Sequence, residues 1–534
     1  MAVTSAIIGR LKMAALILLM GLIGLPSPSL SAGARDGRQL VVAMASLQNE
    51  TFLPWNGGGN RKFYLDTIYE YLVYLDPVTD ALVPGLAERW EMSADGRSYT
   101  FWIRPGIAFH EGWGEVTAAD VKYSVERMIG PRSIAGPSSS LRKLIRDVTT
   151  PSPNLVTITL NTPDIEFIRG YIVNANQLSI VSKTYIETVG DQKANAHPIG
   201  TGPFTLAERK RGLNITLRVA DAAKPHWRIG RPAMDAIVFK SAPEEATRIA
   251  MLYTGEADLA PVNYDSLSAV KRAGLSIHLF KDSWSPVVRL GGLVETLPGF
   301  YNPKVPWAKK KVRQALNYAI DKEAILKHIF HGLGRVASSD FPADEWRDVA
   351  TYPYDPDQAR RLLAEAGYPD GFDITLKTFT TVPGAELPIV AEAVALYWQA
   401  VGIKVNIVPV DWNSLRAAST TGNATDYVWT HRGLSFPSPL TGLQAGFSPA
   451  SVFASYANDQ TGQWLERIGT ELDPARRRML IHDMGQFLRD EAAAVFIVIA
   501  HDPWASGPRI ARWPFIRYQV TNIDQITLSD GRAP

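Results

Sequence analysis

The clearest pattern of hydrophobic and polar positions lies between residues 71 and 129. Residues 87–92 and 98–104 read as two strands, and Asp95-Gly96 between them supplies the positive φ angles that a tight hairpin needs. In the second strand Tyr99, Phe101 and Ile103 share one face. The pattern therefore predicts an antiparallel hairpin with one buried face.

Apolar residues at helical spacing recur along the chain. Thr117 is expected to cap a helix, with Asp120 as the reciprocal acid. Residues 312–332 are predicted to be helical, and Asp473 with Pro474 opens a later helix. The buried face of that later helix is expected to carry Met479, Leu480, Met484, Phe487 and Leu488.

A strand, a helix and a strand follow one another at residues 236–239, 244–253 and 259–262. This succession is typical of the βαβ unit of a parallel sheet. Further short apolar strands are predicted at 39–45 and 495–500. With 534 residues the chain should form two or three domains of the α/β class.

The amino terminus has the pattern of a secretory signal. Arg10 and Lys12 precede an apolar run at 13–25, which is shorter than the roughly 20 residues that cross a bilayer. Small residues at 32–34 suit cleavage near Ala34, and an uncleaved membrane anchor is the alternative. Cleavage removes those two basic residues and no acid, so the formal charge of +2 falls to zero. A neutral chain gives no reason to expect nucleic-acid binding.

The sequence contains no cysteine, which excludes disulfides, cysteine-ligated metals and a lipid anchor on an N-terminal cysteine. It also lacks the His-Glu-x-x-His, Gly-x-Ser-x-Gly and Gly-x-x-x-x-Gly-Lys-Ser/Thr motifs. His328 and His331 could share a helix face, but histidines near a helix end also suit the helix dipole. We therefore expect no catalytic residue, no metal site and no cofactor. A glycosidase-like pair of carboxylates stays open, because spacing alone does not exclude it.

Several blocks resemble one family. Residues 86–126 read LAERWEMSADGRSYTFWIRPGIAFHEGWGEVTAADVKYSVE, residues 200–203 read GTGP, 312–321 read VRQALNYAID and 354–368 read YDPDQARRLLAEAGY. In this order they resemble the peptide-binding group of extracellular solute-binding proteins, the dipeptide and oligopeptide receptors of bacterial ABC importers. The resemblance covers nearly all of the mature chain.

The resemblance implies two α/β lobes of the periplasmic binding protein type, with an additional domain inserted in the first lobe and two strands crossing between the lobes. The implied segments are a signal peptide (1–34), lobe I (35–69, 198–285 and a C-terminal return at 503–534), the extra domain (70–197) and lobe II (286–502). A ligand would lie between lobes that close by a hinge motion.

The resemblance points to residues 426–439, DYVWTHRGLSFPSP, as a ligand segment. Peptide receptors of the family carry there an acid that binds the ligand's α-ammonium, whereas this chain has Leu434, Ser435 and Phe436 where a tryptophan and the acid are expected. A ligand with a free amine is therefore in question. Arg432 suits a ligand carboxylate or carbonyl. The predicted ligand-binding residues are Asn49, Phe52, Trp284, Trp412, Trp429, His431, Arg432 and Phe436.

The function implied is capture of a peptide or peptide-like solute in the periplasm, by a monomer that performs no chemistry and serves an ABC permease with its ATPase subunits. The alternative ligands are an opine, an oligosaccharide or a modified amino acid. A secreted hydrolase and a periplasmic sensor subunit are further alternatives, and the sequence does not separate the sensor from the importer component.

Overall fold

The structure is a computed structural model that describes residues 38–47, 50–57, 61–174, 178–381, 384–449, 451, 454–514 and 520–529. The predicted signal peptide and Asn49 lie outside the described residues.

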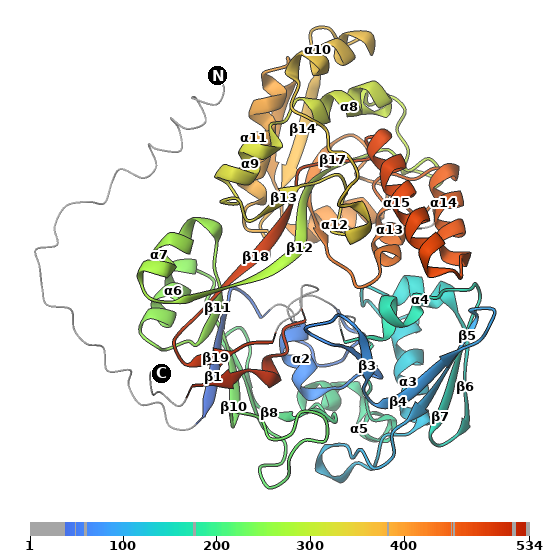
Figure 1. Cartoon of the computed structure of the whole chain (residues 1–534), viewed down its shortest axis with the longest axis vertical. Helices are drawn as coiled ribbons and strands as arrows, with labels where there is room; N and C mark the ends of the chain where they lie inside the picture. Colours follow the sequence, from blue (N-terminus) through green and yellow to red (C-terminus); the bar gives the residue numbers. More distant parts are fainter. Residues whose placement is uncertain are drawn as a thin grey trace, which may run out of the picture.

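One long mixed sheet runs through both halves of the molecule (Figure 1). Its strand order is β15-β14-β16-β12-β18-β11-β1-β10-β9-β8, with β13 beside β18 and β17 beside β12. Strands β12 and β18 pair with each other, and each also continues the sheet on its other side, toward β16 and β11 respectively. The strands are β1 (Gln39–Met44), β8 (Phe204–Lys210), β9 (Asn214–Val219), β10 (Ala236–Ser241), β11 (Leu259–Pro261), β12 (Ser276–Leu290), β13 (Gly334–Val336), β14 (Asp373–Thr378), β15 (Lys404–Pro409), β16 (Val428–Leu434), β17 (Val495–Phe496) and β18 (Val498–Ser506).

The first lobe is built around the predicted βαβ unit. Strand β1 pairs in parallel with both β10 and β11, and the helix between these two is α6. Alternate residues of β1 enter two different hydrophobic cores, so the strand is buried on both faces. The other elements of this lobe are α2 (Lys62–Ile68), α6 (Glu245–Tyr253), η4 (Tyr264–Ser266), α7 (Leu267–Arg272), β19 (Ile510–Arg512), η7 (Ile523–Gln525) and β20 (Thr527–Leu528).

The extra domain carries an antiparallel sheet of its own, in the order β4-β5-β7-β6. The predicted hairpin is confirmed as β4 and β5, and Tyr99, Phe101 and Ile103 are buried. The predicted capping box is also confirmed, since the Asp120 carboxylate accepts a hydrogen bond from the Thr117 N–H at 2.9 Å. The elements are β2 (Val73–Leu75), β3 (Leu82–Pro84), β4 (Ala87–Met92), β5 (Ser98–Ile103), η2 (His110–Gly112), α3 (Ala118–Ile129), α4 (Ser138–Leu144), β6 (Ile145–Ser152), β7 (Leu155–Leu160), η3 (Ile168–Ile172) and α5 (Lys183–Ala196).

The second lobe is rich in helices. Its elements beside the sheet are η5 (Pro306–Ala308), α8 (Lys310–Tyr318), α9 (Lys322–His328), η6 (Asp344–Trp346), α10 (Pro356–Glu365), α11 (Leu387–Gln399), α12 (Trp412–Thr420), α13 (Pro439–Phe447), α14 (Asp459–Thr470) and α15 (Pro474–Asp490).

Two helix predictions in this lobe need correction. Region 312–332 divides into α8 and α9, because the Asp321 side chain accepts from the Ala324 N–H at 2.9 Å and so starts a new helix. Met479 is 65% exposed, because the buried face of α15 runs through Arg477, Ile481, Met484 and Leu488.

The C-terminal return contacts the first lobe. Residues 504–506 of β18 pair with β11, and Asp524 forms an ion pair with Arg228 at 3.1 Å. We keep the predicted segment boundaries as a proposal and use lobe I, extra domain and lobe II for those residue ranges.

Candidate functional site

The two crossing strands bring one set of side chains to a single face where the lobes meet. Trp284 of β12 lies opposite both Leu434 of β16 and Ala500 of β18. Residues directly opposite in an antiparallel pair share a face, and so do alternate residues of one strand. Arg432, Trp284, Asp502 and Trp504 therefore lie on the same face of the sheet.

Aromatic rings from lobe I cover one end of this face. Phe63 of α2 stacks on Trp504 with ring centroids 5.3 Å apart, and Phe280 and Trp513 pack against the same indole at 6.2 and 5.6 Å. Phe63 stays half-buried, whereas Trp504 is only 3% exposed. Aromatic walls of this kind are common in sites for small organic ligands.

We call the part of this face where lobe I and lobe II meet the junction. Two carboxyl groups lie on its lobe II side. Burial raises the pKa of Asp502 to about 7, although Trp504, whose indole N–H donates to Oδ2 at 3.3 Å, and Arg432 both lower it. Glu386 is the residue before α11, and burial raises its pKa to about 7 as well. Its charged neighbours are acids, among them Asp502 and Glu245, and they raise its pKa further.

Arg432 is the predicted site residue that the fold brings to this junction. Burial lowers the pKa of its guanidinium to about 10, Asp502 opposes this effect, and Nη1 lies 3.4 Å from the Thr381 hydroxyl. Trp284 is also on this face but is fully buried. Its indole is paired with the hydroxyl of Tyr264, which itself donates to the His501 carbonyl at 2.6 Å.

Three other predicted residues lie on the opposite side of the sheet. Strand alternation separates His431 and Trp429 from Arg432, and Trp412, which is 37% exposed, packs on the His431 ring at 5.8 Å. That side is covered: a Cβ added to Gly433 would lie 1.8 Å from the Asp340 carbonyl oxygen. Burial lowers the pKa of His431 well below its usual value, so this imidazole is neutral.

The remaining predicted residues also have packing roles. Phe52 is fully buried in the lobe I core, 5.3 Å from the Tyr64 ring, because the segment that carries it folds inward. Phe436 packs edge-on against Phe341 at 6.3 Å. These positions give Phe52, Phe436, Trp412, Trp429 and His431 no part in the junction described here.

Sequence reasoning missed Asp502, Glu386, Phe63 and Trp504. Ala500, Asp502 and Trp504 alternate along β18, and extending the predicted strand 495–500 by this alternation would have found two of them. Glu386 carries no such signal, since only the packing of α11 on β14 and β16 brings it near Asp502.

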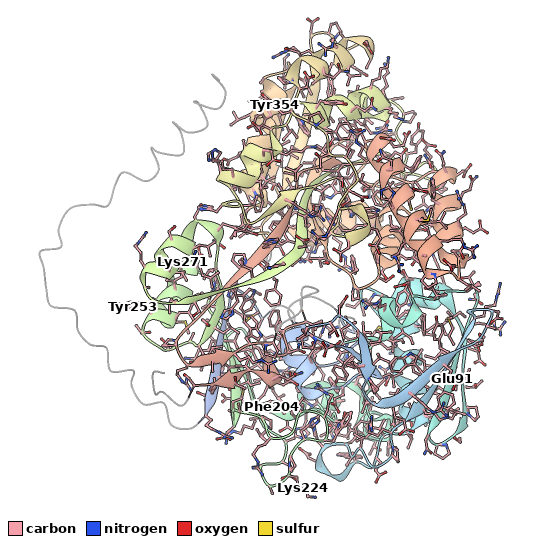
Figure 2. All side chains as sticks on the ribbon, in the orientation of Figure 1. Glu91, Phe204, Lys224, Tyr253, Lys271 and Tyr354 are labelled. Carbon is pink, nitrogen blue, oxygen red and sulfur yellow. The ribbon has the colours of Figure 1, made fainter. Side chains whose placement is uncertain are left out.

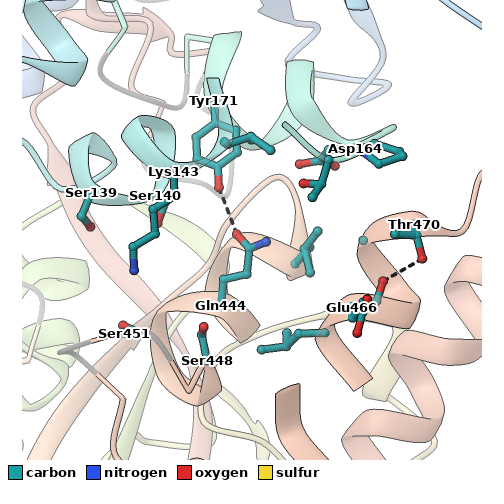
Figure 3. A pocket seen from close by; sticks show the side chains of 16 residues that line it. Ser139, Ser140, Lys143, Asp164, Tyr171, Gln444, Ser448, Ser451, Glu466 and Thr470 are labelled. Carbon is teal, nitrogen blue, oxygen red and sulfur yellow. Dashed lines mark hydrogen bonds between the residues drawn. The ribbon is translucent and has the colours of Figure 1, made fainter. Parts of the chain in front are cut away.

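A cavity lies away from the crossing strands, between the extra domain and lobe II (Figure 3). This cavity of about 530 Å³ is lined by Ser139, Ser140 and Lys143 on one side and by Gln444, Ser448 and Ser451 on the other. Beside it the Tyr171 hydroxyl donates to Gln444 Oε1 at 3.0 Å, so the extra domain and lobe II touch here directly.

Comparison with known proteins agrees with this architecture. The model of the bacterial extracellular solute-binding proteins, family 5 middle, matches residues 81–453. Heme-binding protein A of Haemophilus influenzae is 30% identical over 408 residues, which cover 70% of this chain and 71% of that protein. Probable di/tripeptide-binding protein 5 of Pseudomonas aeruginosa is 28% identical over 494 residues, covering 86% and 89%. The chain belongs to the family 5 bacterial extracellular solute-binding proteins.

The fold is that of the family's solved structures. The dipeptide-binding protein of Pseudoalteromonas sp. SM9913 in complex with Met-Leu superposes with a TM-score of 0.78 at 23% identity, covering 92% of this chain and all of that one. The family 5 proteins are solute-binding components of transport systems, so the predicted family is confirmed. Within the described ranges no helix is both long and apolar enough to span a membrane, and no cluster of metal-binding side chains occurs.

Proposed function

We propose that this family 5 protein captures a peptide or peptide-like solute between its lobes in the periplasm and delivers it, unchanged, to an ABC permease and its ATPase subunits. It acts as a monomer without cofactor. Lobe closure over the solute forms the complex that docks on the permease.

One observation carries this proposal: side chains from both lobes converge on a strand that belongs to both. Phe63 of lobe I stacks on Trp504 of β18. Arg432 of lobe II lowers the pKa of Asp502, which lies two residues earlier on the same strand. A solute held there contacts both lobes at once, which is how binding can stabilise a closed form. Arg432 offers a planar, permanently charged partner for a carboxylate.

The proposal is tested by thermal shift with defined solutes. We expect dipeptides with a free carboxylate to raise the Tm of the protein by mass action. Opines, oligosaccharides and hemin are the comparison solutes. No shift with any dipeptide would reject the peptide assignment, and a shift with another class would replace it.

The variant Arg432→Gln tests whether Arg432 binds the carboxylate of the dipeptide. Arg476→Gln is its control, because the Arg476 side chain is 72% exposed in lobe II. Loss of a charged hydrogen bond should weaken dipeptide binding by about tenfold in the first variant and leave it unchanged in the second. Dipeptide amides, which lack the carboxylate, should bind both variants and the wild type equally.

Closure can be followed directly because the chain has no cysteine. Lys224 and Tyr354 lie near opposite ends of the molecule (Figure 2). Dyes on Lys224→Cys and Tyr354→Cys should report a shift in distance when a dipeptide is added. An unchanged distance with saturating dipeptide would contradict the hinge mechanism.

A further inference from the structure

Acidic side chains outnumber basic ones at the junction between the lobes. Glu386 and Asp502 both face it, and the groups that act on Glu386 electrostatically, Asp502, Glu245 and Asp265, are all acids. Glu245 is held by the Asn263 N–H and side-chain amide at 2.5 and 2.7 Å. Arg432 is the cation that acts on Asp502. The local field therefore favours a cation.

These carboxyl groups are half-buried without the partners that buried charges usually have. Among the described residues, the Asp502 carboxyl accepts one hydrogen bond, from the Trp504 indole at 3.3 Å, and neither acid forms an ion pair with a basic group. Removing a carboxylate from water without a counter-charge is unfavourable, so burial keeps such groups protonated until a cation arrives.

The other polar groups at this place are engaged within the protein. The Trp284 indole, fully buried on the same face as Asp502, is paired with the Tyr264 hydroxyl, which itself donates to the His501 carbonyl at 2.6 Å. The carboxyl groups of Asp502 and Glu386 are half-buried, so they are the acceptors at this place that a bound cation can reach.

We propose that Asp502 and Glu386 bind the ammonium group of a zwitterionic, peptide-like ligand whose carboxylate is bound by Arg432. The assignment rests on the proposed function and names the chemistry of its ligand. Segment 434–436 lacks the acid that binds the ligand's ammonium in related peptide receptors. In this chain Asp502 of β18 and Glu386 before α11 would supply that negative charge.

The test compares ligands that differ only in their amine. Met-Leu and Ala-Phe are titrated beside their N-acetyl forms, together with leucinamide, which has an ammonium group and no carboxylate. We expect the N-acetyl forms to bind at least tenfold more weakly, the loss typical of one charge-assisted hydrogen bond. Asp502→Asn and Glu386→Gln should each weaken the free dipeptides and leucinamide by about tenfold. Asp357→Asn, on a side chain that is 77% exposed, is the control.

A purely structural role predicts a different result. If the acids only supported the fold, their amides would lower the Tm of the ligand-free protein. We expect the Tm to stay or rise, since each amide removes a buried ionisable group, while the shift caused by the dipeptide disappears. N-acetyl forms that bind as tightly as the free dipeptides would overturn the assignment, and so would failure of leucinamide and both dipeptides to bind. Binding of leucinamide without either dipeptide would support the ammonium site and reject the peptide function.

Discussion

The raised pKa values of Asp502 and Glu386 make ligand affinity depend on pH in a direction that can be worked out. An ammonium ion binds the ionised carboxylate, so binding must release the proton that burial holds there. With a pKa of about 7, one such carboxyl is roughly 3% ionised at pH 5.5 and about half ionised at pH 7.0. The α-amino group of a peptide, with a pKa of about 7.7–8.0, stays mainly protonated over this range.

The expected gain is therefore about 15-fold in affinity between pH 5.5 and 7.0, or about 1.6 kcal/mol, if one ionised carboxylate suffices. Two adjacent acids do not ionise independently, so the gain for two is smaller than the product of the single gains. His431, His501 and His278 all have pKa values lowered by burial, which limits their share of any slope between pH 6.5 and 7.

The stability of the ligand-free protein should change in the opposite direction. For both acids the folded pKa lies above the unfolded value of about 4, so their contribution is present below pH 4 and is lost as pH rises through 7. The ligand-free Tm should thus fall while dipeptide affinity rises. Few structural explanations produce these two opposite slopes together.

Calorimetry measures the effect directly. Titrations of Ala-Phe at pH 5.5, 6.0, 6.5 and 7.0, in buffers of different ionisation enthalpy, give both the affinity and the number of protons released, which should approach one at pH 6. The double variant Asp502→Asn/Glu386→Gln should show neither slope nor proton release. A flat affinity in the wild type, or an equal slope in the double variant, would refute the reasoning.

Two further predictions concern other parts of the molecule. Lys322 is 3% exposed, and burial lowers its pKa to about 7, so Lys322→Met should raise the unfolding free energy by about 1–3 kcal/mol at pH 6. Because the unfolded lysine titrates near pH 10.4, this gain should shrink as pH approaches 10, and a loss of stability in urea titrations at pH 6 would contradict it. Tyr171→Phe removes the hydroxyl that donates to Gln444 between the extra domain and lobe II, so dipeptide Kd should rise two- to fivefold with an unchanged fold. An unchanged Kd would show that this contact does not contribute to closure.

The sequence predicts those parts of the fold that depend on local rules. Thr117 and Asp120 are three residues apart, and their capping box needs no information from elsewhere. The break between α8 and α9 could have been predicted in the same way, since Asp321 is a strong N-cap in the middle of a helical pattern. The apolar residues keep their helical spacing on both sides of Asp321, so the pattern predicts one continuous helix. The N-cap at Asp321 starts a second helix there instead.

The site depends on sheet register, which is why most of it escaped prediction. The resemblance of segment 426–439 to ligand segments of the family predicts both Arg432 and His431 as ligand-binding residues. Strand alternation puts these two side chains on opposite faces of the sheet. Asp502 and Glu386 lie 70 and 46 residues from Arg432 in sequence. Only the pairing of β12 with both β16 and β18, and the packing of α11, bring these groups together.

The place of Asp502 on a crossing strand has a consequence for the order of binding. Strand β18 is part of the sheet in both lobes, whereas Arg432 and Glu386 belong to lobe II and Phe63 belongs to lobe I. In the hinge motion that we propose, Asp502 is the group whose position changes least, because it lies on one of the strands about which the lobes would rotate. An ammonium bound there is held in the open and the closed form alike, so it contributes affinity without favouring closure. The proposed carboxylate contact to Arg432 and a ligand contact to the Phe63 ring would require both lobes, and we therefore expect these contacts to supply the free energy that closes the protein.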